Sequence, residues 1–207
     1  CHVFIDKKAD FKKALSIVIN SKTQRYGVCN AMETLLVHKD FPKKFLSIIL
    51  DELLENNVEI RGCKNILKMN TNIIPASVDD WYKEYLAPIV SIKIVKNIDE
   101  AINHISKYGS MHTDAIISSD KKSIDQFKKR VNSSSIMINT STRYADGFEY
   151  GLGAEIGIST DKLHARGPVG LIGLTKAAKE LDYLIGAAFY PAILIVGLSS
   201  IYFARVG

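Results

Sequence analysis

Short apolar segments alternate with amphipathic ones along most of this chain, and that alternation most constrains its fold. Segments typical of strands lie at His2–Ile5, Thr34–Val37, Val58–Ile60, Ile89–Val95, Ala115–Ile117 and Ile136–Ile138. Segments with helical spacing of apolar residues separate most of them, as in Asn97–Tyr108 and Ile124–Val131. Strands joined by helices usually pair in parallel, and the helices then cover both faces of the sheet. The sequence therefore predicts an α/β fold with a mostly parallel sheet flanked by helices.

Three polar residues mark where helices should begin. Asp10, Asp40 and Asn97 each precede an amphipathic segment, and each has a side chain that can cap a helix amino end. Glu100 follows Asn97 by three positions, which is the spacing of a capping box. The first of these helices is expected to end near Ile19.

The charge of the chain is moderate and dispersed. Of its 207 residues, 47% are apolar and 24% are charged, which is enough for a core and argues against disorder. The net charge is +5, and much of the positive charge falls in pairs on predicted helices: Lys7-Lys8, Lys12-Lys13, Lys43-Lys44 and Lys121-Lys122. Solvated helix faces explain these pairs better than a nucleic-acid patch does, so no nucleic-acid partner is expected.

Cysteine and histidine usage indicates neither a disulfide framework nor a metal site. Cys1, Cys29 and Cys63 give an odd count without metal-ligand spacing, and the five histidines are scattered along the chain. We therefore expect reduced thiols, no metal, and a cytoplasmic location.

Cys29 is the candidate nucleophile. Lys22 and Arg25 lie within seven residues on its amino-terminal side, and an apolar strand follows it. Nearby cations lower the pKa of a thiol, and the thiolate suits attack on an acyl carbon that carries an anionic leaving group. Taken alone, Cys29 also fits a small buried hydrophobe in a charged neighbourhood, so these residues leave both interpretations open.

Further blocks downstream bear on that choice. The segments 139–147 (NTSTRYADG), 150–160 (YGLGAEIGIST) and 163–168 (LHARGP) follow one another. Together with 22–25 (KTQR) and 28–30 (VCN), they resemble the gamma-glutamyl phosphate reductase family of the aldehyde dehydrogenase superfamily. The resemblance extends over about residues 1–175, and implies an aldehyde-dehydrogenase-like catalytic domain there, followed by a divergent apolar tail over 176–207.

The resemblance implies a chemistry for the site. In the family a cysteine thiolate attacks the acyl carbon of gamma-glutamyl phosphate and expels phosphate. NADPH then reduces the thioester, and glutamate 5-semialdehyde is released for proline biosynthesis. Cys29 would be the nucleophile, with Asn30 beside it, and Glu84 would contact the ribose of NADPH. Binding of the substrate and its phosphate is expected from Lys22, Arg25, Arg143, His164 and Arg166.

Chemistry favours two of these cations in particular. Charge develops on the departing phosphate, and the planar guanidinium forks of Arg143 and Arg166 can each bind two of its oxygens. Asp146 and Glu155 are expected to hold neighbouring cations or amides. Tyr26 stands where the family usually has proline, which makes the rigidity of the cysteine loop an open point.

The resemblance also implies what the chain does not contain. The family's dinucleotide-binding half would precede Cys1, so we expect a truncated or processed piece that binds NADPH poorly alone. A complementary half is therefore an expected partner. Family members are typically homo-oligomers, and self-association is expected here too.

The carboxyl-terminal stretch is different in kind. From Tyr183 to Ala204 there are 22 residues without a charge, close to the number that crosses a bilayer as a helix. A membrane helix over 183–204 is one interpretation, and a buried helix or pair of strands is the other. The first leads to a rival function, a reductase-derived, non-catalytic, membrane-attached subunit or an interaction protein of a larger complex.

Overall fold

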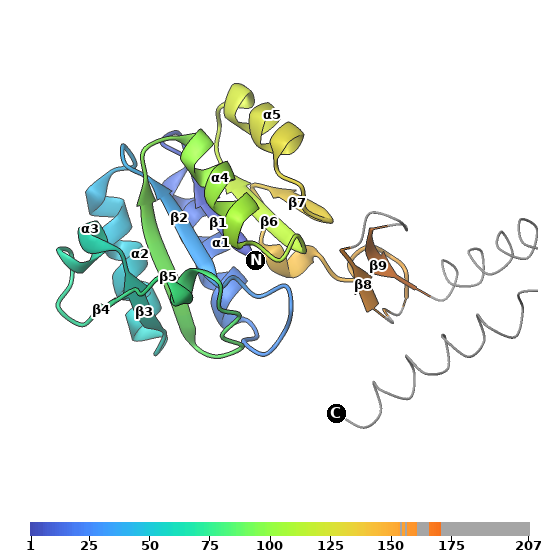
Figure 1. The fold of residues 1–207 in the computed structure, drawn as a ribbon, viewed down its shortest axis with the longest axis horizontal. Helices are drawn as coiled ribbons and strands as arrows, with labels where there is room; N and C mark the ends of the chain where they lie inside the picture. Colours follow the sequence, from blue (N-terminus) through green and yellow to red (C-terminus); the bar gives the residue numbers. More distant parts are fainter. Residues whose placement is uncertain (154, 156, 161–165, 171–207) are drawn as a thin grey trace, which may run out of the picture.

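A seven-stranded sheet forms the centre of the molecule, and every pair of neighbouring strands in it is parallel. The computed structural model describes residues 1–153, 155, 157–160 and 166–170 (Figure 1). The strand order is β4-β3-β5-β2-β1-β6-β7. The strands are β1 (His2–Ile5), β2 (Thr34–His38), β3 (Glu59–Gly62), β4 (Ile74–Pro75), β5 (Ile89–Val95), β6 (Thr113–Ile117) and β7 (Ser135–Ile138).

This sheet confirms the predicted α/β class. Of its strands only the two-residue β4 has no counterpart in the sequence prediction, because the chain around it is weakly patterned. Parallel strands buried on both faces consist almost entirely of apolar residues, and for that reason the apolar runs located most of them correctly.

Helices cover the sheet on both faces. α1 (Phe11–Thr23), α2 (Lys43–Glu55) and α3 (Lys64–Leu67) pack on one face, and α4 (Ile98–Tyr108) and α5 (Lys121–Arg130) pack on the other. Within β1, Val3 and Ile5 point into the first hydrophobic cluster and Phe4 into the second. Burying one such side chain stabilises the fold by about 1.5–3 kcal/mol, so the alternation fixes which face each helix covers.

Two of the predicted helix caps are confirmed. The Asp10 carboxylate accepts a hydrogen bond from the backbone N–H of Lys13 at 2.9 Å. The Asn97 side chain accepts one from the N–H of Glu100 at 3.0 Å. The Glu100 carboxylate, however, accepts from the N–H of Lys96, so the reciprocal half of the capping box is displaced by one residue.

Two helix boundaries were predicted wrongly. Helix α1 continues to Thr23 because Ser21 and Lys22, beyond the predicted end, still face the interior. Helix α2 is preceded by Pro42 and has no side-chain cap, whereas the N–H of Asp40 donates to His38. Asp40 therefore belongs to the turn after β2.

The remaining elements are short. Two 3-10 turns, η1 (Asp79–Trp81) and η2 (Thr142–Tyr144), precede the antiparallel pair β8 (Gly157–Ser159) and β9 (Gly167–Val169). Figure 1 shows this pair beside the sheet, on the side of β7, and the Ser134 hydroxyl donates to the carbonyl of Ser159 at 2.9 Å. The predicted apolar segment 183–204 lies outside the described residues. No helix within the described residues is both long and apolar enough to cross a bilayer.

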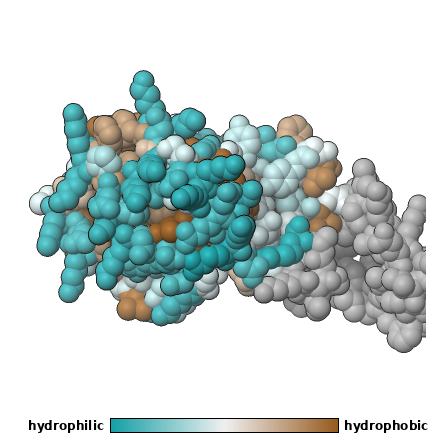
Figure 2. Space-filling model, turned by 90° about the horizontal axis from the view of Figure 1, so that it is seen from above, coloured by the Kyte–Doolittle hydropathy of each residue, from teal (hydrophilic) through white to brown (hydrophobic). Residues whose placement is uncertain are grey.

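The basic pairs noted in the sequence lie at the surface. All eight lysines of the four pairs are exposed. Figure 2 shows one face of the molecule, on which hydrophilic residues predominate and apolar surface is confined to small patches. These lysines therefore lie on solvated faces, as predicted.

Candidate active site

Cys29 lies at the amino-terminal edge of the sheet, in the loop between α1 and β2, and it is exposed. Cys1 stands next to it, just before β1, because β1 and β2 begin side by side with His2 paired to Thr34. The Cys1 thiol donates to the carbonyl of Cys29 at 3.1 Å. A contact from the start of the neighbouring strand thus holds the backbone of the cysteine loop.

Asn30 ties this loop to the segment around η2. Its side-chain amide donates to the carbonyl of Ala145 at 3.0 Å and lies 3.5 Å from that of Arg143. Asn30 is only 3% exposed. Asn30, which was expected beside the nucleophile, is therefore buried, and its side-chain amide holds the backbone of the segment around η2.

Arg143 is the cation that the structure brings to the thiol. Its Nε donates to Gln24 Oε1 at 2.7 Å, and its charge lowers the pKa of Cys29. Desolvation and the charge of Arg25 in turn lower the pKa of Arg143, while Asp146 and Cys29 raise it. Arg143 therefore lies within electrostatic reach of both Arg25 and Cys29. Gln24, which holds Arg143, was not singled out in the sequence.

Lys22 occupies a different environment from the one expected. The residue is 0% exposed, and its ammonium lies 2.8 Å from Glu33 Oε2. The other Glu33 oxygen accepts from the N–H of Leu86 at 3.3 Å. Burial lowers the pKa of Lys22 and raises that of Glu33, and their mutual attraction opposes both shifts. Because α1 continues past Lys22, the Lys22 side chain points into the core. The partner of its ammonium there is Glu33, and not the substrate phosphate that was expected.

The expected lowering of the thiol pKa is also corrected. The pKa of Cys29 is raised, first by partial burial and then by the carboxylates of Glu155 and Glu84. The backbone N–H of Cys29 itself and the Arg143 charge lower it, but less. Within the described residues, that N–H donates to no carbonyl, so it remains a candidate oxyanion donor. At neutral pH, Cys29 is therefore mainly a thiol in this chain.

The Glu155 carboxylate is held near the Cys29 thiol by a hydrogen bond from the backbone. Its Oε2 accepts from the N–H of Gly147 at 2.8 Å, and Asp146 accepts from the N–H of Phe148 at 2.9 Å. Both carboxylates hold amides, as the sequence predicted. A Cβ added at Gly147 would lie 2.7 Å from that of Glu155, so this close approach requires glycine.

Glu84 lines a cavity next to the cysteine loop. The cavity measures about 210 Å³, and Cys1, Glu33 and Tyr108 also line it. The Glu84 carboxylate is exposed, and its charge raises the pKa of Cys29. An exposed carboxylate there could accept a hydrogen bond from a ribose hydroxyl, so this part of the chain fits one edge of a nicotinamide nucleotide.

The remaining predicted residues lie elsewhere or outside the described residues. Arg166 clamps Asn132, donating to its side-chain oxygen at 2.8 Å and to its carbonyl at 2.9 Å. Asn132 belongs to the loop before β7. His164 lies outside the described residues. Within those residues, no group of His, Cys, Asp and Glu side chains could hold a metal ion.

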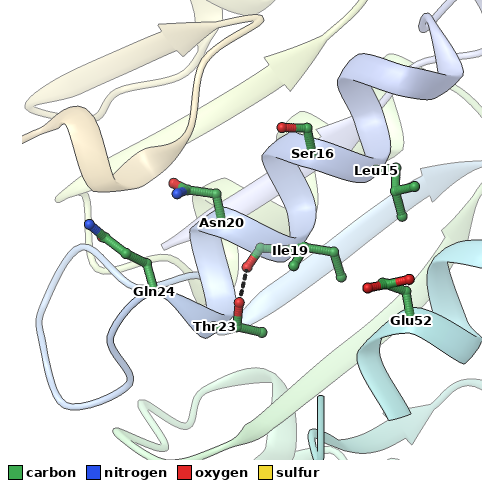
Figure 3. Close-up of a pocket in the computed structure, with 7 residues that line it drawn as sticks. All are labelled: Leu15, Ser16, Ile19, Asn20, Thr23, Gln24 and Glu52. Atoms are coloured by element: carbon green, nitrogen blue, oxygen red, sulfur yellow. Dashed lines mark hydrogen bonds between the residues drawn. The ribbon is translucent and has the colours of Figure 1, made fainter. Parts of the chain in front are cut away.

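An open groove of about 450 Å³ runs beside the site between α1 and α2. Figure 3 shows that all its labelled residues except Glu52 belong to α1 or directly follow it. Glu52 projects from α2 on the other side. Gln24, at the end of the α1 row, is the residue that accepts from Arg143. The groove is lined by no thiol and no cation, whereas both are present on the Cys29 side.

Comparisons with known proteins show the family of the chain. No family model matches the chain. Among solved structures, gamma-glutamyl phosphate reductase from Thermotoga maritima is similar at 48% identity over 84% of this chain and 42% of that one, with a TM-score of 0.82. The Saccharomyces cerevisiae enzyme of the same name is 32% identical over 70% of this chain and 36% of that one, with a TM-score of 0.55.

More distant structures share the fold alone. A 1-pyrroline-5-carboxylate dehydrogenase from Thermus thermophilus is 13% identical over 68% of this chain and 35% of that one, with a TM-score of 0.56. The sheet and its helices thus define a protein with the fold of these dehydrogenases. Within it, the chain belongs to the gamma-glutamyl phosphate reductase family. It spans less than half the length of the two reductases that it matches.

Proposed function

We propose that this chain is the catalytic portion of a gamma-glutamyl phosphate reductase and that Cys29 is its nucleophile. The observation that carries the proposal is that Asn30 fixes the loop of the exposed Cys29 thiol against the segment of Arg143, whose guanidinium donates to Gln24. The family membership supports the substrate, an acyl phosphate, and a role in proline biosynthesis.

The acylation step follows from this placement. The exposed Cys29 thiol first loses its proton to solvent water, and the positive charge of Arg143 favours that loss. The thiolate sulfur then forms a bond to the acyl carbon, and the bond between that carbon and the phosphate oxygen breaks. Phosphate leaves with the electron pair, and a thioester remains on Cys29. Arg143 and Arg25 hold the phosphate oxygens, and the N–H of Cys29 faces the acyl oxygen.

Reduction requires a cofactor that this chain holds only in part. When bound, NADPH supplies the hydride that reduces the thioester. Glu84, which lines the cavity beside Cys1, would hold the ribose of NADPH by accepting a hydrogen bond from it. The other contacts come from the portion of the reductases that lies outside the length this chain spans. We propose that this portion completes the enzyme, that the enzyme self-associates, and that it acts in the cytoplasm.

The rival function, a non-catalytic membrane-attached subunit, depends on residues 183–204. These lie outside the described residues, and no observation on the described ones favours that function.

The proposal is tested on the chain itself with acetyl phosphate as the acyl donor. We expect mass spectrometry of digested protein to find a hydroxylamine-labile acetyl group on Cys29. Cys29→Ser should abolish that adduct, and Cys63→Ser should leave it unchanged. Equal modification of Cys63, or no thioester on Cys29, would overturn the assignment of the nucleophile.

A further inference from the structure

A second cavity lies at the edge of the sheet opposite to Cys29. It measures about 400 Å³ and opens at the carboxyl ends of β2 and β5. These neighbouring strands send the chain to opposite faces, β2 to α2 and β5 to α4. In open α/β sheets such a divergence leaves a crevice outside the strand ends, and ligands bind there. The topology of the sheet therefore explains why a cavity forms at this place.

Cations line this cavity from three elements. Lys39 follows β2, Lys43 is the first residue of α2, and Lys68 follows α3. All three are exposed, and none makes an ion pair within the described residues. Two acids act on His38: the Asp40 carboxylate lies 3.8 Å from its Nδ1, and the charge of Asp6 also reaches it, but neither acid lines the cavity. The cavity thus carries an excess of positive charge.

His38 adds a fixed hydrogen-bond donor. It is 5% exposed, and its Nδ1 accepts a hydrogen bond from the N–H of Asp40 at 3.0 Å. An imidazole whose Nδ1 accepts carries its proton on Nε2. Within the described residues Nε2 has no hydrogen-bond partner, and His38 lines the cavity. This buried side chain therefore keeps one N–H for a ligand.

The start of α2 lies beside the same cavity. Helix α2 has 13 residues and begins after Pro42 without a side-chain cap. The N–H groups of Phe45 and Leu46 donate to the Pro42 carbonyl, whereas those of Lys43 and Lys44 donate to no carbonyl within the described residues. The positive end of the helix dipole there favours an anion, and phosphate is the usual one. Apart from Asn65, the rest of the lining is apolar, from Phe41, Leu46, Met69 and Ile94.

We propose that this cavity binds a small organic phosphate. The phosphate lies against Lys43, Lys68 and the Nε2–H of His38, and the apolar body packs between Phe41 and Met69. The site lies at the other end of β2 from Cys29, so it does not depend on the function proposed above.

The test uses phenyl phosphate as the probe, with inorganic phosphate and phenol as its two halves. Titrations of the 207-residue chain are followed by NMR of the backbone amides. We expect phenyl phosphate to bind more tightly than either half, with the largest shifts at residues 38–46 and 65–69. The double variant K43Q/K68Q should bind it about tenfold more weakly, because two favourable charge contacts are lost.

A matched control removes the same charge elsewhere. K12Q/K129Q changes two exposed lysines of α1 and α5 that do not line the cavity, and should leave the affinity unchanged. H38Q, which retains an N–H donor but not the fixed Nε2, should weaken binding by a smaller factor. Equal weakening in both double variants, or shifts confined to the Arg25 and Arg143 loops, would overturn the proposal. Circular dichroism of each variant checks that loss of binding does not reflect loss of fold.

Discussion

The side-chain amide of Asn30 donates to the carbonyl of Ala145 at 3.0 Å, across 115 positions of sequence. This bond fixes the loop that carries Cys29 against the segment that carries Arg143. The positions of the Cys29 thiol and the Arg143 guanidinium, which are proposed to act on the acyl phosphate, thus both depend on the buried Asn30 side chain.

Replacing Asn30 by alanine tests that support. Asn30→Ala leaves the Ala145 carbonyl buried without its donor, which should cost about 1–3 kcal/mol of unfolding free energy. Acylation of Cys29 by acetyl phosphate should slow more than alkylation by iodoacetamide, since only acylation uses Arg143. Denaturant unfolding and both rates are compared with Asn20→Ala, an exposed position on α1. Equal slowing of the two reactions would argue against a positioning role.

The charges around Cys29 should govern its titration. Arg143→Gln removes a charge that lowers the thiol pKa, and Glu155→Gln removes one that raises it. The midpoint of iodoacetamide alkylation against pH should therefore move up in the first variant and down in the second. The amide oxygen introduced by Glu155→Gln can still accept from the N–H of Gly147, which keeps the local backbone in place. Shifts of the same sign in both variants would contradict this electrostatic picture.

Arg143 and Arg166 should differ in how much each contributes to the rate of Cys29 acylation. Removing Arg143 should slow acetyl transfer by at least about tenfold, the scale expected for a group that stabilises developing charge. Arg166→Gln should change the rate much less, because Arg166 binds Asn132. The comparison uses pseudo-first-order acylation rates. They are measured at a pH where the Cys29 thiol is ionised to the same extent in both variants. A comparable loss in Arg166→Gln would mean that Arg166 reaches the phosphate after all.

The Lys22–Glu33 pair should govern stability. Lys22→Met leaves the Glu33 carboxylate buried and unpaired, which should cost about 3–5 kcal/mol. Without the Lys22 ammonium, burial raises the pKa of Glu33 in the folded state. There is then a pH range in which Glu33 is protonated in the folded state and ionised in the unfolded state. The folded state then binds more protons, so stability should fall as pH rises above the ordinary range of a glutamate.

Thermal unfolding at pH 5 and pH 8 measures that effect, and Lys12→Met is the control on the exposed side of α1. The variant Lys22→Met should lose more stability at the higher pH than the control does. The double variant K22M/E33L should recover much of the loss, since no unpaired charge remains. If Lys22→Met lost the same stability at both pH values, the loss would come from altered packing and not from the unpaired carboxylate.

Sequence patterns were sufficient for six of the seven strands of the sheet, since a buried parallel strand has few residues that are not apolar. Thr34–His38 is an example, with its apolar core at Leu35, Leu36 and Val37. Asp10 and Asn97 were predictable for a similar reason, because a cap depends on residues within one turn.

The site depended on relations that no local pattern contains. Whether Lys22 points to solvent is decided by where α1 ends, and helix ends are the least certain feature of a sequence. Gln24 meets Arg143 across 119 positions, and Glu155 acts on Cys29 across an even longer interval. Such pairs are set by how the loops fold over the sheet edge, so only the structure identifies them.

The place of β1 in the sheet has a consequence for how the chain folds. β1 lies between β2 and β6, and the hydrogen bond from His2 to Asp114 spans 112 positions. During synthesis one edge of this central strand stays unpaired until residues 113–117 have emerged. Closing so long a loop before any pairing is gained makes folding slow, and the open apolar edge is prone to aggregation in the meantime. Refolding yield should therefore fall steeply with protein concentration, and chaperones that shield strand edges should restore it.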